Sequence, residues 1–485
     1  MKKLLVANRG EIAVRVIRAC RALGIPSVAV YSEADRAARH TRLADEAVAI
    51  GPAPARESYL VIEKLLAAAR ETGCDAVHPG FGFLSENARF AEAVQQAGLI
   101  WVGPPPSAIE AMGLKIESRE RMRAAGVPVV PGTHDIASAA ERERVGLPVL
   151  VKASAGGGGK GMRVVRDAGE LEGAVEACRR EALAAFGDGT VYLERYLERP
   201  RHIEVQVFGD RQGRVAAIGE RECSLQRRHQ KVIEESPSPA VTAELRARLC
   251  GAAAAAARAV GYVNAGTVEF LLAPDGAFYF LEMNTRLQVE HPVTEEAYGV
   301  DLVALQLAVA DGEPLPADLP SEPRAHAMEA RVYAEDADHG FLPQTGRLLA
   351  YQEPSGPGVR VDSGVEEGSE VSVHYDPMLA KVIARGANRE EARRRLVAAL
   401  SEMVLLGVTT NLSYLRRVLA SDEVIRGEMH TALLETMALA PPPAPPQEVF
   451  AAAAYLLSAP EPTAAAAGTP AFPDPFLAGA FRTLS

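Results

Sequence analysis

The stretch KLLVANRGEIAVRVIRACRALGIPSVAVY, residues 3–31, contains a complete strand–helix–strand pattern. Residues 3–7 predict a short buried strand, Gly24 suits a helix end, and residues 28–31 form the next apolar run. The apolar residues of the intervening helix recur at helical spacing: Ile12, Ala13, Val16, Ile17 and Cys20. A helix between two buried strands is typical of a parallel α/β sheet.

The same rhythm continues outward from this unit. Apolar runs at 47–50 and 76–78 extend the predicted parallel sheet over roughly the first 115 residues. Further along, an alanine-rich run at 251–260 predicts a helix, and residues 441–446 read Pro-Pro-Pro-Ala-Pro-Pro, a stiff linker composition. The chain of 485 residues is therefore expected to contain about three structural units.

Composition limits the class of protein. Apolar residues make up 48% and charged residues 24%, which argues against wholesale disorder, and a net charge of −11 argues against a nucleic-acid coat. The five cysteines form no CxxC pair, which fits a reducing compartment. Because the N-terminal apolar run ends at Asn8 and no run of about 18 apolar residues occurs, we expect a cytoplasmic protein without a signal peptide or transmembrane span.

Residues 154–161, Ser-Ala-Gly-Gly-Gly-Gly-Lys-Gly, are the clearest local signal. Gly156, Gly158 and Gly161 satisfy GxGxxG, but strand-like runs flank the segment on both sides, whereas a dinucleotide fingerprint leads from a strand into a helix. A Walker A loop is excluded because Lys160 is followed by glycine. The segment is interpreted as a mobile hairpin whose N–H groups cover phosphates; the alternative is a flexible surface hairpin.

Lysine is scarce, with eight lysines against 44 arginines. Two of the eight, Lys152 and Lys160, flank the glycine segment, and Lys231 ends the polar cluster 226–231. Lys115 is a further candidate. Because arginine supplies most of the positive charge, these lysines are candidates for a site, although the 226–231 cluster can also be a solvated surface segment.

Two strand-like runs, 267–272 and 277–282, flank an Asp275-Gly276 dipeptide that favours a two-residue hairpin turn. With that turn, Glu269 lies directly opposite Glu282. Like charges across a ladder destabilise it unless solvent, a proton or a cation compensates. Carboxylates with phosphate are ligands that Mg²⁺ prefers, so a metal site is predicted, with a water-facing hairpin as the alternative. The prediction depends on the register.

Polar and apolar side chains alternate over residues 282–290. The polar members are Glu282, Asn284, Arg286, Gln288 and Glu290. An extended chain would place them on one face over about 26 Å, which one ligand atom cannot span. Either the chain bends, or the row serves successive parts of a two-substrate site, and the second alternative is favoured. Arg286 would then offer a planar fork to an anion, and Glu290 a general base.

The combined motifs resemble the biotin carboxylase family of the ATP-grasp superfamily, over residues 1 to about 440. The segments that carry the resemblance are 7–13, 78–87, 156–161, 222–231 and 282–295. It implies an α/β ATP-grasp fold with four parts. These are an N-terminal Rossmann-like (pre-ATP-grasp) domain at 1–115, an ATP-grasp region at 116–310 with a glycine-rich lid at about 130–203, a C-terminal biotin carboxylase α+β domain at 325–440, and a Pro/Ala-rich linker and tail at 441–485.

The resemblance also implies a reaction, in which ATP activates bicarbonate as carboxyphosphate and CO₂ passes to biotin on a carrier. The implied nucleotide residues are Lys115, Lys152, Gly157, Gly158, Gly159, Glu194, Leu197, His202, Gln226, His229 and Leu271. The implied ligands of Mg²⁺ or Mn²⁺ are Glu269, Glu282 and Asn284. The implied bicarbonate residues are Lys231, Arg286, Gln288 and Val289. The implied catalytic set is Lys231, Arg286, Glu290 as the base, and Arg331 as the arginine that stabilises the biotin enolate.

The C-terminal region resembles the front of an acyl-CoA carboxylase α chain, through residues 375–381 and the tail around 474–482. No Ala-Met-Lys-Met biotinylation motif occurs, so biotin is expected on a carrier protein or on a further domain. The expected partners are that carrier, a carboxyltransferase, and a second copy of the chain in a homodimer or larger complex. Nucleic acid and membrane are not expected.

Four functions stay open at this point. The favoured one is a C–N bond-forming ligase, the biotin carboxylase component of an acyl-CoA carboxylase. The alternatives are the biotin carboxylase subunit of a pyruvate carboxylase, another ATP-grasp carboxylate–amine ligase, and a carboxylase-like scaffold that binds nucleotide without turnover. The final acceptor of the carboxyl group stays undetermined, because it belongs to a carboxyltransferase.

Overall fold

The computed structural model describes residues 1–113, 115–133, 136, 143, 145–154, 162–228, 230–441, 444 and 446–458. The expectations for Gly157, Gly158, Gly159, His229 and the side chain of Lys115 lie outside these residues. The chain divides into two units, Met1–Ala440 and Pro441–Ser485, and the described helix of the second is α16 (Gln447–Ser458). Within the described part, no helix combines the length and apolar character that a membrane crossing requires.

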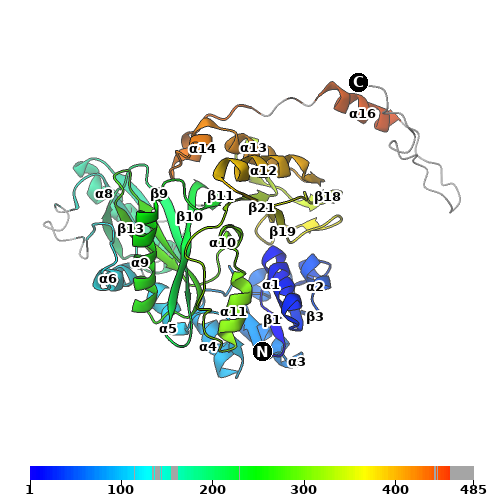
Figure 1. Cartoon of the computed structure of the whole chain (residues 1–485). Coiled ribbons are helices and arrows are strands. Elements are labelled where there is room, and N and C mark those ends of the chain that lie inside the picture. The colour runs from blue at the N-terminus through cyan, green and yellow to red at the C-terminus, as the bar shows by residue number, and fades with distance from the viewer. Residues whose placement is uncertain are drawn as a thin grey trace. The chain divides into compact units, whose positions relative to one another are not determined.

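The N-terminal part is the parallel sheet that residues 3–31 predict, drawn in blue in Figure 1. The helix predicted after the first strand is α1 (Gly10–Leu23), and it ends at Gly24, whose φ of 70° is the left-handed conformation that favours glycine. The strands, in the order β3-β2-β1-β4-β5, are β1 (Leu4–Val6), β2 (Ser27–Tyr31), β3 (Glu46–Ala49), β4 (Ala76–His78) and β5 (Ile100–Trp101). The other helices are α2 (Arg39–Leu43), α3 (Ile62–Glu71), α4 (Ala88–Gln96) and α5 (Pro106–Gly113).

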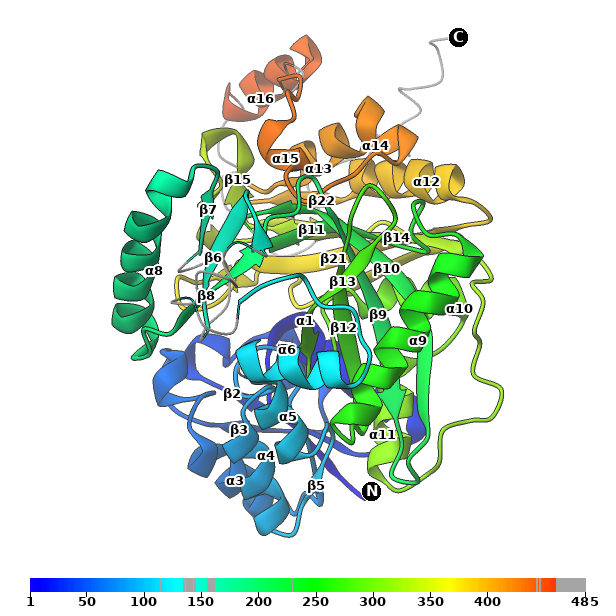
Figure 2. The same cartoon turned by 90° about the vertical axis from the view of Figure 1, so that its left-hand side faces the viewer.

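A small three-stranded sheet follows α6 (Lys115–Ala124) and lies with its helix at the left of Figure 2. Its elements are β6 (Val149–Ala153), β7 (Met162–Val165), β8 (Val191–Arg195) and α8 (Leu171–Phe186). The antiparallel pairing of β6 with β7 confirms that the glycine segment connects two strands of a hairpin. Val149, Val151, Val165 and Leu193 form the small apolar core under α8.

An eight-stranded sheet runs through the centre of the Met1–Ala440 unit. In the order β13-β12-β9-β10-β11-β14-β21-β19, its strands are β13 (Phe278–Asn284), β12 (Asn264–Leu272), β9 (Arg201–Gly209), β10 (Val215–Arg227), β11 (Gln230–Ser236), β14 (His326–Tyr333), β21 (Met378–Gly386) and β19 (Val359–Ser363). Strands predicted for two different domains thus share one sheet. Helices α10 (His291–Tyr298) and α11 (Leu302–Ala310) follow β13 in the chain.

The helix predicted at 251–260 is longer than expected. It is α9 (Ala243–Ala259), which begins after Thr242, whose hydroxyl accepts a hydrogen bond from the Leu245 amide. A threonine N-cap followed by good helix formers explains the earlier start.

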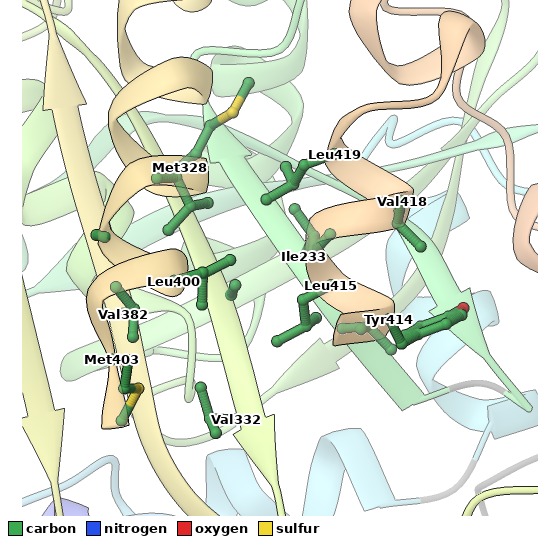
Figure 3. Packing of buried hydrophobic residues seen from close by; sticks show 14 of the residues in the cluster. Ile233, Met328, Val332, Val382, Leu400, Met403, Tyr414, Leu415, Val418 and Leu419 are labelled. Atoms are coloured by element: carbon green, nitrogen blue, oxygen red, sulfur yellow. The ribbon is translucent and has the colours of Figure 1, made fainter. Parts of the chain in front are cut away.

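The C-terminal helices α12 (Arg389–Glu402) and α13 (Leu412–Leu419) pack on the far strands of the large sheet (Figure 3). Buried side chains such as Leu400 and Leu415 meet Ile233 and Val382 there, which fixes the sheet against the helices. The smaller elements around this core are β15 (Glu335–Asp336), β16 (Leu342–Pro343), β17 (Gly346–Arg347), β18 (Ala350–Gln352), β20 (Glu370–Val371), β22 (Val404–Leu406), α14 (Asp422–Arg426) and α15 (Leu433–Thr436).

Candidate active site

Glu269 of β12 lies directly opposite Glu282 of β13, as the sequence predicts, but the hairpin reaches this pairing by a different route. The loop has three residues, 274–276, because the Gly276 amide donates to the Ala273 carbonyl and Gly276 has a φ of 81°. The pairs near the turn are therefore offset by one residue. A register shift immediately after Glu269 removes the offset, so the two acids face each other.

The polar row after Glu282 does not stay extended. Of the two alternatives for residues 282–290, the structure shows the bend, and the assignment of the row to successive parts of a site stays a prediction. Strand β13 ends at Asn284, and the chain then bends. As a result, the Asn284 Nδ2 and the Gln288 Nε2 both donate to Glu269 Oε1, at 2.8 and 3.4 Å. Two members of the row thus reach one carboxylate, whereas Glu290 contacts Lys231 and Arg331.

Lys231 of β11 is the centre of a buried ion cluster. Its Nζ lies 2.5 Å from Glu204 Oε2, 2.8 Å from Glu269 Oε1 and 2.6 Å from Glu290 Oε1. Burial by itself would lower the pKa of Lys231, but Glu204, Glu269 and Glu290 raise it well above the usual range. Lys231 is thus a permanent cation that joins three acids from three separate segments.

Arg331 of β14 holds the other side of Glu290. Its Nη2 lies 2.9 Å from Glu290 Oε2, while its Nε donates to Glu234 Oε1 at 2.6 Å. Burial would raise the pKa of Glu290, but Lys231, Arg331 and Arg221 together hold it well below its usual range. Glu290 is therefore an ionised carboxylate inside the protein, placed at the start of α10.

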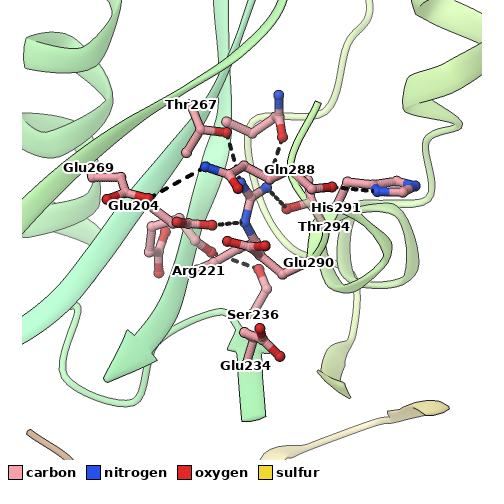
Figure 4. Close-up of polar contacts among 12 residues, drawn as sticks. Glu204, Arg221, Glu234, Ser236, Thr267, Glu269, Gln288, Glu290, His291 and Thr294 are labelled. Atoms are coloured by element: carbon pink, nitrogen blue, oxygen red, sulfur yellow. Dashed lines mark hydrogen bonds and ion pairs between the residues drawn. The ribbon is translucent and has the colours of Figure 1, made fainter. Parts of the chain in front are cut away.

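Arg221 of β10 is completely buried, and Figure 4 shows it among Glu204, Thr267 and Thr294. It donates to the side chains of Glu204, Gln206, Thr267 and Thr294. These partners come from β9, β12 and α10, so one guanidinium ties together the elements that carry the cluster. A buried charge is tolerated when it is paired and hydrogen-bonded in this way.

Donor atoms suited to a cation gather around Glu269. The His202 Nε2 lies 3.1 Å from Glu269 Oε2, and ligand atoms of His202, Glu204 and Glu269 all lie within 4.8 Å of one another. Burial lowers the pKa of His202, but Glu269 raises it above its ordinary value overall. Glu282 is the direct strand partner of Glu269, and Asn284, which pairs with Thr267, reaches Glu269 with its side chain. Paired carboxylates with an amide form an oxygen-rich donor set that fits Mg²⁺.

Lys152 of the central strand β6 and Glu194 of β8 form a second buried ion pair on the small sheet. The Lys152 Nζ donates to Glu194 Oε2 at 2.8 Å, and Arg119 Nε lies 3.1 Å from Glu194 Oε1. Burial would lower the pKa of Lys152, but Glu194 and, more weakly, Glu282 raise it. The electrostatic effect of Glu282 links this pair to the hairpin acids. Lys152 lies two residues before Ser154, where the glycine segment begins, so a cation stands at the base of the predicted flap.

Arg286 is held by the N-terminal part of the chain. Its Nε lies 3.1 Å from Glu86 Oε2, and its Nη1 donates to Gln288 Oε1 at 3.0 Å. Glu86 also accepts a hydrogen bond from the Thr285 amide at 3.2 Å. The bend after Asn284 is thus braced by a residue about 200 positions away.

Family models match three consecutive regions of the chain: the biotin carboxylase N-terminal domain at residues 1–109, the carbamoyl-phosphate synthase L chain ATP-binding domain at 115–318, and the biotin carboxylase C-terminal domain at 329–436. A pyruvate carboxylase subunit of Methanothermobacter thermautotrophicus is 52% identical over 89% of this chain and 89% of its own length. The chain belongs to the biotin carboxylase family. Members of this family are ATP-dependent ligases with an ATP-grasp fold, so the predicted family, enzyme class and fold class are confirmed.

Other relatives differ in length and name. The α subunit of mitochondrial methylcrotonoyl-CoA carboxylase from Oryza sativa is 52% identical over 90% of this chain, and the chain spans about 60% of that relative's length. Among solved structures, a biotin carboxylase–β-γ-ATP complex from Campylobacter jejuni has a TM-score of 0.87 at 42% identity, covering 90% of this chain and 99% of its own. The biotin carboxylase domain dimer of Hydrogenobacter thermophilus 2-oxoglutarate carboxylase, with MgADP, ADP and bicarbonate, has a TM-score of 0.85 at 44% identity, covering 90% and 97% of the two chains.

The biotin carboxylase fold brings most of the sequence-predicted site residues into contact. The cluster around Glu269 contains His202, Lys231, Asn284, Gln288, Glu290 and, through Glu290, Arg331. Leu271 pairs with His202, and Gln226 with Lys231, across neighbouring strands. Lys152 and Glu194 form their own pair, Arg286 contacts Glu86, and Leu197 lies half-buried between β8 and β9. The roles assigned to these residues stay predictions.

Sequence reasoning missed Glu204, Arg221, Glu234 and Glu86. A usable signal existed for Glu204, because His202, Glu204 and Gln206 alternate with apolar residues and so share one face of β9. No comparable pattern marks Arg221, which follows a register shift in the pairing of β10 with β9. The cluster 226–231 is solvated only in part, because Arg228 and Gln230 are exposed whereas Gln226 and Lys231 are largely buried.

Proposed function

We propose that this chain is the biotin carboxylase component of a biotin-dependent acyl-CoA carboxylase. It uses ATP and bicarbonate to carboxylate biotin on a carrier protein or domain, through carboxyphosphate. The observation that carries the proposal is the chain of contacts Lys231–Glu290–Arg331, which joins an ionised carboxylate to two buried cations beside the paired acids of the hairpin.

Glu290 is assigned as the base that deprotonates bicarbonate. Its pKa in the ion cluster is too low for an effective base, because Lys231 and Arg331 stabilise its charge. Bicarbonate is itself an anion. When it binds beside Lys231 and Arg331, the two cations interact with bicarbonate as well as with Glu290, and the added negative charge raises the pKa of Glu290. The substrate thereby activates the base that it needs, while Arg286 and Gln288 orient the anion and Arg331 stabilises negative charge that develops on biotin.

Glu269, Glu282 and Asn284 are assigned to hold Mg²⁺, which supplies neutralisation of phosphate charge when it is bound. The residues assigned to nucleotide binding are Lys152, Glu194, Leu197, His202, Gln226 and Leu271. The closing of the glycine segment over the phosphates would keep water from a labile intermediate. Binding of Mn²⁺ at this site in place of Mg²⁺ stays a prediction.

Glu282→Gln tests the metal assignment. We expect the Mg²⁺ concentration for half-maximal ADP release to rise at least ~10-fold, because the variant loses one anionic oxygen ligand. A Mg²⁺ titration of initial rates measures the effect, and Glu244→Gln, an exposed acid of α9, is the matched control. An unchanged Mg²⁺ requirement in the Glu282 variant would remove that residue from the metal site.

The final acceptor is the open part of the proposal. Similarity to the α subunits of methylcrotonoyl-CoA carboxylases supports an acyl-CoA. The similarity to the pyruvate carboxylase subunit of M. thermautotrophicus, over 89% of both chains, supports a second candidate in which the acceptor is pyruvate. Either assignment implies a biotinylated carrier and a carboxyltransferase as partners, and a homodimer or larger complex. The relatives include mitochondrial and chloroplastic proteins, so a cytoplasmic location stays a prediction.

Bicarbonate-dependent ADP release, measured with and without free biotin, tests the function. We expect release to require bicarbonate and to increase when biotin is added. Stimulation by an amine, with no response to biotin, would indicate a carboxylate–amine ligase instead. Nucleotide binding without any turnover would indicate a scaffold.

A further inference from the structure

One rung of the large sheet faces the segment that carries Glu290. Arg331 of β14 lies directly opposite Lys381 of β21, and Lys381 lies directly opposite Asp362 of β19. Side chains that are directly opposite in antiparallel strands share one face of the sheet. Arg331 and Lys381 therefore stand side by side, and each contacts the same short segment.

The two cations bind different atoms of this segment. Arg331 binds the Glu290 side chain, with its Nη2 2.9 Å from Oε2. Lys381 binds the backbone, because its Nζ donates to the Val289 carbonyl oxygen at 2.7 Å. That carbonyl belongs to the peptide that joins Val289 to Glu290, so the lysine fixes the plane from which the Glu290 side chain departs.

Neighbouring carbonyls are satisfied from within the segment. The Leu287 carbonyl accepts from Arg286, and the Gln288 carbonyl accepts from the His291 amide at 3.3 Å. Lys381, in contrast, is 92 residues away from Val289 in sequence and lies on a different element. Its contact therefore ties the segment to the C-terminal strands, whereas the local hydrogen bonds connect only residues within the segment.

Lys381 itself lies beside acids of α1 and β19. Its side chain is completely buried, and its Nζ lies 3.3 Å from Glu11 Oε1 of α1 and 4.0 Å from Asp362. The start of α1 packs closely against the end of β19, since a Cβ on Gly364 would lie only 2.6 Å from the Glu11 amide nitrogen. Burial would lower the pKa of Lys381, but Glu11, Glu329 and Asp362 raise it, so the ammonium stays charged. A buried lysine is costly unless it is paired, which favours a specific role for this one.

We propose that Lys381 is a positioning residue for carboxylation: anchored by Glu11, it holds the Val289 carbonyl so that Glu290 and Arg331 are aligned for bicarbonate and biotin. This inference rests on the proposed function of Glu290. It assigns a role to a lysine that is neither in the nucleotide site nor a biotin acceptor. It also makes the contact between α1 and β21 part of the catalytic geometry.

Lys381→Met tests the proposal, because methionine fills similar space without donating a hydrogen bond. We expect the kcat for bicarbonate-dependent ADP release to fall ~100-fold, the size that a small misplacement of a reacting group produces, while the KM for ATP changes less than about twofold. The matched control is Lys3→Met, since Lys3 Nζ also donates to a distant carbonyl, that of Thr72 at 2.7 Å, but far from the site in the N-terminal sheet. Lys381→Arg, which keeps the charge and a donor, should recover part of the lost rate.

Hydrogen exchange gives a readout that does not depend on activity. The amides of Val289, Glu290, His291 and Val293 should exchange at least ~10-fold faster in Lys381→Met than in the unaltered chain, because the anchor of this segment is lost. If the methionine variant does not fold, Glu11→Gln, which weakens the hold on Lys381, should show the same kcat and exchange effects at smaller size. Unaltered kcat and unaltered exchange in a folded Lys381 variant would overturn the proposal, and so would equal losses in kcat and ATP affinity. If the unaltered chain lacks biotin-stimulated turnover but the variant shows faster exchange, the proposed function fails while the anchoring role stands.

Discussion

Glu290→Gln is expected to lower bicarbonate-dependent ADP release by roughly 10²–10⁴-fold, the range that general base catalysis contributes, while ATP binding persists. Glutamine keeps the shape of the side chain and an oxygen that can accept from Arg331, whose Nη2 lies 2.9 Å from the carboxylate. The variant removes the capacity to take a proton, and its NH₂ group then faces the Lys231 ammonium, which lies 2.6 Å from the other carboxylate oxygen, so a buried ion pair is lost as well. Initial rates at saturating ATP and bicarbonate measure the loss.

A matched control separates the loss of a base from the loss of a buried ion pair. Glu220 of β10, the residue before Arg221, is also completely buried, and its carboxylate is bound by Arg246 at 2.7 and 2.9 Å. Glu220→Gln should reduce stability by a similar amount and leave turnover within about threefold of the unaltered rate. If Glu290→Gln retains its turnover, Glu290 is not the base. If it loses ATP binding as well, its role is structural.

The sequence alone predicted the parts of this structure that depend on local pattern. Apolar spacing identified the parallel sheet that begins at Leu4, and the Asp275-Gly276 turn led to the pairing of Glu269 with Glu282. The second prediction was right although its turn was wrong, because a three-residue loop and a register shift compensate each other. A shift of that kind depends on the contacts of both strands and leaves no local signature.

The parts that sequence reasoning did not reach depend on contacts between distant segments. The bend after Asn284 is braced by Glu86, and Glu290 is held by Arg331 of a strand that the sequence assigned to another domain. The eight-stranded sheet joins those strands to the hairpin, so the site is complete only when both regions are folded. An alternating pattern can show which residues share a face, as for His202 and Glu204, but not which distant face they meet.

Lys231→Met is expected to affect both stability and turnover. Removing one partner of a buried ion pair costs about 3–5 kcal/mol, because the remaining charge is left uncompensated. Here the lost ammonium faces Glu204, Glu269 and Glu290. Without it, the pKa values of Glu204 and Glu290 should rise. Glu290 should therefore lose part of its charge. Denaturant unfolding at neutral pH measures the first effect.

Lys231→Arg separates this stability effect from the chemical one. Arginine keeps a buried cation and should recover most of the unfolding free energy, but its planar group cannot reproduce three short contacts made by a single ammonium nitrogen. Both variants should therefore lose at least ~10²–10³-fold in bicarbonate-dependent turnover, the loss expected when one preorganised charge at a developing anion is removed. Normal turnover in Lys231→Arg would mean that the cluster needs only a positive charge there, and Lys231 would then have a structural role with no specific part in binding bicarbonate.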